Sequence, residues 1–184
     1  MARQFDLYSL VDKHSQYKFC SAVFHRNGYK YATNRFILCK IKAQYDEIFE
    51  GRLVNKDGTM LPEDTPCPKY DLCIPEITED FVSVEVNFAK VKSWQNEAKL
   101  HKKEWGKKAP IYVYMSSIDV AFEYSTFIKC IKAMCSLGIS SIWAHAEKRM
   151  APVVAKSDIA SIVVMPSVAQ KKYDNTDDIK WFVL

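Results

Sequence analysis

The chain has 184 residues, of which 48% are hydrophobic and 26% charged, a balance typical of a soluble globular protein of one domain or two small ones. No stretch approaches the roughly 18 consecutive apolar residues of a membrane span, and the first ten residues lack the apolar core of a secretory signal, so we expect a cytoplasmic protein with no membrane partner. The net charge of +4 permits a nucleic-acid partner without requiring one.

The cysteine pattern favours free thiols over disulfides or metal ligands. Six cysteines are spread along the chain: Cys20, Cys39, Cys67, Cys73, Cys130 and Cys135. They form no Cys-x-x-Cys pair, and nothing in the sequence indicates an oxidising compartment. Zinc sites favour tighter spacing and four ligands. We therefore expect buried free thiols, no metal and no cofactor.

The first part of the chain is predicted to form one short helix followed by hairpins. Apolar residues at a loose helical period predict the helix over residues 5–14. Two-residue hairpin turns need positive φ at their central positions, and Asn-Gly and Asp-Gly pairs supply it most readily. Such pairs occur at Asn27-Gly28 and at Asp57-Gly58.

A proline-rich connector is expected in the middle of the chain. Before it, residues 35–43 are predicted to form a strand. Residues 62–75 contain four prolines, which remove backbone donors and favour an extended path. We expect at most a short strand there, at residues 72–74. The connector is the best candidate boundary between two halves.

The second half begins with an alternating segment and a lysine-rich one. Residues 81–88 alternate between apolar and polar side chains, which predicts a strand. Residues 93–108 lack proline and β-branched runs, so they form either a helix capped by Ser93 or a charged insertion. Residues 110–115 predict another short strand.

The clearest prediction is a helix followed by three strands. Ser125 is a candidate N-cap and Gly138 a candidate C-terminal stop. Between them, apolar side chains recur on one face: Phe127, Ile128, Ile131, Met134 and Cys135. Short strands are predicted next, at residues 141–147, 151–156 and 160–166. Helices followed by hairpin-linked strands predict an α+β fold with antiparallel sheets.

Three segments together resemble the bacterial DNA polymerase sliding clamps (beta subunits). They are the helix-to-strand region ending in IVVMPSV, the segment ATNRFIL over residues 32–38, and CPKYDLCIP over residues 67–75. The chain departs from the family where Asn34-Arg35 replaces Asp-Gly and where Ser167 replaces a second Met. It is also too short for the three domains of a complete clamp.

The resemblance implies one divergent clamp-like domain, with two helices packed on antiparallel sheets. It would cover residues 1–184, with possible halves at residues 1–75 and 76–184 and a basic insertion at about residues 90–108. Since one such domain cannot encircle a duplex, a ring would require a homo-oligomer.

The resemblance also implies sites for double-stranded DNA and for peptides. Clamp helices line the DNA channel with basic residues, which touch phosphates without reading sequence. The DNA-binding candidates here are Lys99, Lys102, Lys103, Lys107, Lys108, Lys129 and Lys132, with Trp94 and Trp105 interleaved. The clamp groove that receives short peptide motifs of replication proteins corresponds to Met165, Pro166 and Val168.

Function stays open among three classes. The sequence favours a non-catalytic, DNA-associated clamp-like protein, serving replication or a mobile element. The alternatives are a protein-interaction module without DNA binding and an enzyme whose site lies in no recognised motif. His145 is expected to be structural, because it alternates with Trp143 along a strand. The apolar tail, residues 179–184, either docks in the Met165 groove or forms an edge strand.

Overall fold

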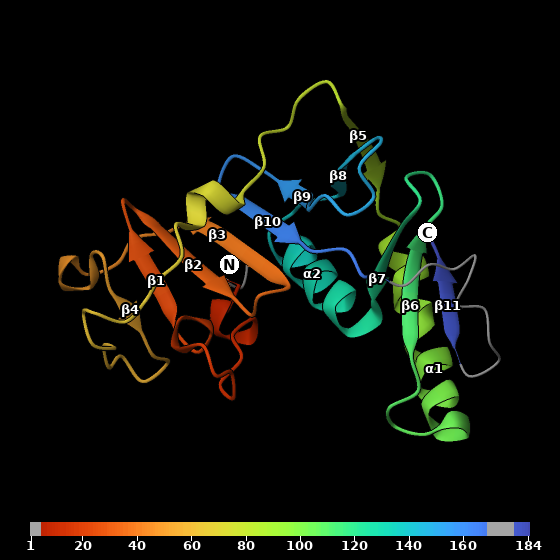
Figure 1. Ribbon diagram of the computed structural model, residues 1–184, viewed down its shortest axis with the longest axis horizontal. Helices are drawn as coiled ribbons and strands as arrows, with labels where there is room; N and C mark the ends of the chain where they lie inside the picture. Colours follow the sequence, from red (N-terminus) through yellow and green to blue (C-terminus); the bar gives the residue numbers. More distant parts are fainter. Residues whose placement is uncertain (1–4, 169–178) are drawn as a thin grey trace.

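The computed structural model describes residues 5–168 and 179–184, which form two helices and two sheets (Figure 1). The helices are α1 (Phe88–Trp105) and α2 (Tyr124–Ser136). The strands are β1 (Val23–Arg26), β2 (Tyr29–Thr33), β3 (Ile37–Lys42), β4 (Leu53–Val54), β5 (Phe81–Glu85), β6 (Ile111–Met115), β7 (Val120–Glu123), β8 (Ser141–His145), β9 (Val153–Lys156), β10 (Ala160–Val164) and β11 (Lys180–Val183).

An eight-stranded antiparallel sheet combines strands from the first and second parts of the chain. Its order is β4-β1-β2-β3-β10-β9-β8-β5, so the first and second parts of the chain meet where β3 pairs with β10. In that pair Val164 lies opposite Ile37 and Ala160 lies opposite Ile41. Every residue of β10 is buried, because this central strand is covered on both faces.

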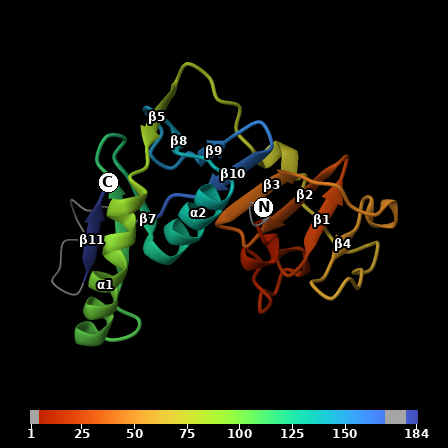
Figure 2. The same ribbon diagram turned by 180° about the vertical axis from the view of Figure 1, so that it is seen from behind.

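The smaller sheet has the order β11-β6-β7 and packs against both helices. Helix α1 lies across this sheet (Figure 2), and α2 lies between the two sheets (Figure 1). The predicted architecture, two helices on antiparallel sheets, is confirmed, with one parallel pair between β6 and β11. None of the helices in the described residues is long and apolar enough to cross a membrane.

The hairpin prediction at Asn27-Gly28 is confirmed. Both residues have positive φ, 50° and 76°, and they connect β1 to β2. The Asp57-Gly58 turn also forms, since the Asn55 N–H donates to the Thr59 carbonyl at 2.8 Å. Only one bridge follows it, between Val54 and Met60, so this second hairpin is very short.

The helix predicted over residues 5–14 is wrong. Only Leu7–Ser9 form a single 3-10 turn, capped by the Asp6 carboxylate, which accepts from the Tyr8 N–H at 2.9 Å. The Asp12 N–H then donates to the Cys20 carbonyl instead of continuing a helix. Leu7 and Leu10 are nevertheless buried in the main core, which explains the loose apolar pattern.

Residues 72–74, where at most a short strand was expected, form no strand. Tyr70–Cys73 form a 3-10 turn that holds the Tyr70 ring in a small second core. That ring stacks on Tyr31 at 5.3 Å and lies 5.4 Å from Phe24. Burying this aromatic side chain on the outer face of the sheet outweighs the extended preference of the neighbouring prolines.

Helix α1 occupies most of the lysine-rich stretch, and its start differs from the prediction. Its N-cap is Asn87, whose side chain accepts from the Lys90 N–H at 2.9 Å, rather than Ser93. The buried stripe of α1 includes Val91 and Trp94. Trp94 stacks on the ring of Phe182 in β11 at 4.9 Å, which anchors the helix to the smaller sheet.

Helix α2 matches its predicted span closely, with two local differences. Glu123 is the N-cap in place of Ser125, and its carboxylate accepts from the Thr126 N–H at 2.8 Å. Gly138 follows the helix with a φ of 67°, as predicted for a C-terminal stop. Cys135 is exposed rather than part of the apolar face.

The C-terminal segment forms the edge strand β11, parallel to β6. In its own chain it therefore does not dock beside Met165, because Ser167 contacts the opposite edge of the same sheet. The Ser167 N–H donates to the Ala121 carbonyl of β7 at 2.7 Å. The last strand thus completes the smaller sheet.

Candidate functional site

The lysines of α2 form an exposed row. Lys129 and Lys132 lie on the side of the helix away from the buried Phe127 and Ile131. Because they are about one turn apart, both ammonium groups point to solvent on one face. This is the arrangement expected from the sequence.

The lysines of α1 and of the turn after it are also exposed. Lys99 and Lys103 lie opposite Trp94 on the helix, with Lys102 on the flank. The remaining two candidates follow Gly106, which ends the helix with a φ of 98°. They are Lys107 and Lys108.

Contacts within the fold determine which charged and aromatic side chains of α1 are accessible on this basic surface. Glu97 of α1 pairs with Lys180 of β11 at 3.1 Å, on the flank of the helix that faces the smaller sheet. Its carboxylate is therefore directed away from the outer lysines. Trp94 is buried, so its ring is not accessible for stacking on bases. Trp105 is 48% exposed and remains accessible.

A second feature is an exposed apolar patch where β3 and β10 meet. The Met165 N–H donates to the Phe36 carbonyl at 2.8 Å, which extends the β3–β10 pairing by one step. Phe36 is 52% exposed, Met165 40% and Val168 80%. We call Phe36, Met165 and Val168 the apolar patch. Pro166, the third groove candidate, is half-buried between the last two.

The turn beside the apolar patch holds a residue in an unfavourable backbone conformation. Arg35 has a φ of 79°, the left-handed region that favours glycine. The Asn34 carboxamide oxygen stabilises the turn, accepting from the N–H groups of Phe36 at 3.1 Å and Ile37 at 2.9 Å. Arg35 is where the chain departs from the glycine that the sequence resemblance implies, and a positive φ is the conformation that glycine adopts most readily.

The Arg35 side chain lies over aromatic rings. Its guanidinium carbon is 5.2 Å from the centroid of Tyr17 and 5.6 Å from that of Phe36. Tyr17 is itself 41% exposed. A cation on two accessible rings next to the apolar patch gives this surface both charge and apolar area.

A hollow of about 640 Å³ connects the apolar patch with the lysine row of α2. Phe36, Asn34 and Lys129 are all among the residues that line it. The structure therefore brings one DNA-binding candidate close to a member of the apolar patch. The sequence did not indicate Phe36, Arg35 or Tyr17, and the only available signal was the replacement of glycine at Arg35.

The groups suited to catalysis or metal binding have structural roles or lie apart. The Nδ1 atom of His145 accepts from the N–H groups of Glu147 at 3.2 Å and Lys148 at 3.3 Å, which caps a turn. Across residues 5–168 and 179–184, no three His, Cys, Asp or Glu side chains are close enough to hold a metal ion. Burial was expected for all the thiols, but it applies only to Cys20, Cys39 and Cys130.

Comparison with known proteins identifies the fold. No family model and no curated protein matches the sequence. Solved structures do match: the Caulobacter crescentus beta sliding clamp has a TM-score of 0.57 at 8% identity, over 88% of this chain and 62% of that one. The fold is clamp-like.

Other clamps agree with this result. The Helicobacter pylori beta clamp bound to a DNA ligase peptide has a TM-score of 0.52 at 11% identity, over 88% of this chain and 61% of that one. The DNA polymerase III beta subunit of Pseudomonas aeruginosa has a TM-score of 0.53 at 8% identity, over 87% and 61%. This chain thus spans less than two thirds of their length, and the likeness concerns the fold alone.

Proposed function

We propose that this protein is a non-catalytic DNA-associated factor that uses the clamp-like fold to present its helices to duplex DNA. The supporting observation is the row of outward lysines on each helix, Lys99 and Lys103 on α1 and Lys129 and Lys132 on α2. The two helices also contact each other. The similar structures are DNA polymerase III subunits, which favours a role in replication, of a chromosome or of a mobile element.

Such a surface would bind the phosphate backbone rather than the bases. Lysine ammonium groups displace condensed counterions from phosphates, so affinity falls steeply with salt and depends little on sequence. The clamp-like domain alone does not surround a duplex, so we also propose self-assembly. The edge strands β4 and β5 of the large sheet and β11 and β7 of the small one supply pairing edges for it.

The test is a charge reversal with a matched control. Lys129→Glu/Lys132→Glu removes two proposed phosphate contacts, and Lys69→Glu/Lys148→Glu makes the same change at exposed positions elsewhere. Both double variants bring the formal net charge from +4 to zero. We expect the first to weaken binding to a labelled duplex about 10-fold or more and to lower the salt slope by about two. Equal losses in both variants would contradict the helix-surface proposal.

A second candidate function is peptide docking at the apolar patch. It is favoured by Arg35, because a strained residue persists where the surrounding structure and function hold it there. A suitable probe is the DNA ligase peptide seen on the Helicobacter pylori clamp. Phe36→Ser should weaken its binding while leaving duplex binding intact, with Ile48→Ser as an exposed apolar control. Binding that ignores the Phe36 change would remove this candidate.

A further inference from the structure

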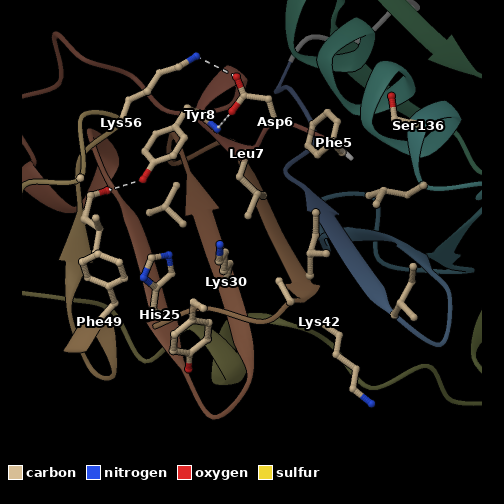
Figure 3. Close-up of a pocket in the computed structure, with 18 of the residues that line it drawn as sticks. Phe5, Asp6, Leu7, Tyr8, His25, Lys30, Lys42, Phe49, Lys56 and Ser136 are labelled. Atoms are coloured by element: carbon tan, nitrogen blue, oxygen red, sulfur yellow. Dashed lines mark hydrogen bonds and ion pairs between the residues drawn. The ribbon is translucent and has the colours of Figure 1, made fainter. Parts of the chain in front are cut away.

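A large hollow lies on the inner face of β1, β2 and β3 (Figure 3). It has a volume of about 1100 Å³, at the upper end of the range for small-molecule sites. Its walls come from residues 5–8, residues 45–49 and the C-terminal end of α2.

Two polar side chains face the hollow from neighbouring strands. His25 of β1 lies directly opposite Lys30 of β2, so both side chains project from the same side of the sheet. His25 is 4% exposed, and its Nδ1 atom has no hydrogen-bond partner. The half-buried Lys30 makes no ion pair with any residue that the structure describes. Lys56, in contrast, is paired with Asp6 at 3.0 Å.

The protonation state of His25 follows from its surroundings. Burial and, to a smaller extent, the Lys30 charge lower the pKa of His25 to about 4, against a smaller opposing effect of Glu50. The imidazole is therefore neutral at pH 7, with one N–H to donate. Lys30 supplies the positive charge beside it. Together they suit one small anionic group.

The remaining wall is aromatic and apolar. The Tyr45 ring stacks on His25 at 4.9 Å, and the Phe49 ring is 5.5 Å from it. Leu7 and Tyr8 line the opposite side, and the Tyr8 hydroxyl donates to the carbonyls of Val54 and Asn55, both at 3.0 Å. Because that hydroxyl is already bonded, the ring presents an apolar surface to the hollow.

The lining carries charges of both signs, because Lys42 and Lys56 line the hollow as well as two carboxylates. The C-terminal end of α2, at Ser136 and Leu137, borders the hollow and carries the negative end of the helix dipole. The Asp6 and Asp46 carboxylates are also at the rim. One carboxylate can be held between Lys30 and His25, whose side chains lie on the same side of the sheet.

We propose that this hollow binds an amphipathic monocarboxylate, with its carboxylate between Lys30 and His25 and its apolar body along Leu7, Tyr8 and Phe49. The observation that supports this role is a neutral imidazole and an ammonium group side by side on one face of the sheet, next to an apolar wall. The role requires neither of the two functions proposed above.

The test compares dodecanoate with dodecanol, which has the same chain and no charge. Calorimetric titration of the full chain should show one dodecanoate site and binding of dodecanol at least about 10-fold weaker. Lys30→Met should weaken dodecanoate about 10-fold and leave dodecanol unchanged, whereas Lys69→Met, at an exposed position elsewhere, should alter neither.

A second variant keeps the proposal testable if Lys30→Met misfolds. His25→Phe preserves the ring that stacks on Tyr45 but removes the N–H, so the preference for dodecanoate over dodecanol should shrink by several fold. Equal binding of the two probes to the unaltered protein would overturn the proposal. So would a preference that both variants retain, or dodecanoate binding at many equivalent sites.

Discussion

The backbone at Arg35 offers a direct test of the turn that links the sequence resemblance to the fold. A left-handed conformation costs a non-glycine residue about 1 to 2 kcal/mol, while glycine loses about 0.5 to 1 kcal/mol more entropy than alanine on folding. With a φ of 79°, Arg35→Gly should therefore be about 0.5 to 1 kcal/mol more stable than Arg35→Ala. Both variants lose the contacts with Tyr17 and Phe36, so those contacts cancel in the comparison.

The control is Ser83, an exposed residue in the middle of β5 with ordinary strand geometry. There the order should reverse, with Ser83→Ala about 0.5 to 1 kcal/mol more stable than Ser83→Gly. Urea unfolding monitored by circular dichroism gives the free energy of unfolding for all four variants. If alanine is the more stable substitution at both positions, the left-handed turn and the reasoning built on it are wrong.

Two further predictions concern stability. The folded pKa of His25 is about 4, below its unfolded value near 6.5, so the unfolded chain binds more protons between these pH values. The free energy of unfolding should therefore fall by about 2 to 3 kcal/mol as the pH drops through this window. His25→Phe should remove this pH dependence, as measured by urea titrations at several pH values. Trp94→Ala should lower the free energy of unfolding by about 3 to 5 kcal/mol, because Trp94 is buried against β11. The control Trp105→Ala should change it by less than about 1 kcal/mol, because Trp105 is 48% exposed. Equal effects of the two variants in thermal melts would contradict the burial of Trp94.

The elements that could be predicted are those specified by neighbouring residues. The Asn27-Gly28 turn depends on two backbone conformations, and the span of α2 depends on its apolar period and on Gly138. The three strands after α2 were predicted for the same local reason. The exposure of Lys129 and Lys132 also follows from helical geometry alone.

The elements that were missed depend on distant partners. Leu7 and Leu10 show helical spacing, but each is buried separately in the core, and the backbone hydrogen bonds of this segment go elsewhere. The parallel pairing of β11 with β6 is a long-range contact that no local pattern encodes. The same limit applies to the apolar patch, because Phe36 and Met165 meet only through the β3–β10 register.

The most direct test of the DNA-binding proposal is the salt dependence of duplex binding by the unaltered protein, with light scattering on the same samples. If about four of the exposed lysines contact phosphates, affinity should fall roughly 100- to 300-fold between 50 and 200 mM salt. Such a slope, reduced by about two in Lys129→Glu/Lys132→Glu, is the predicted result. No duplex binding at 50 mM salt, or binding that salt leaves unchanged, would contradict it.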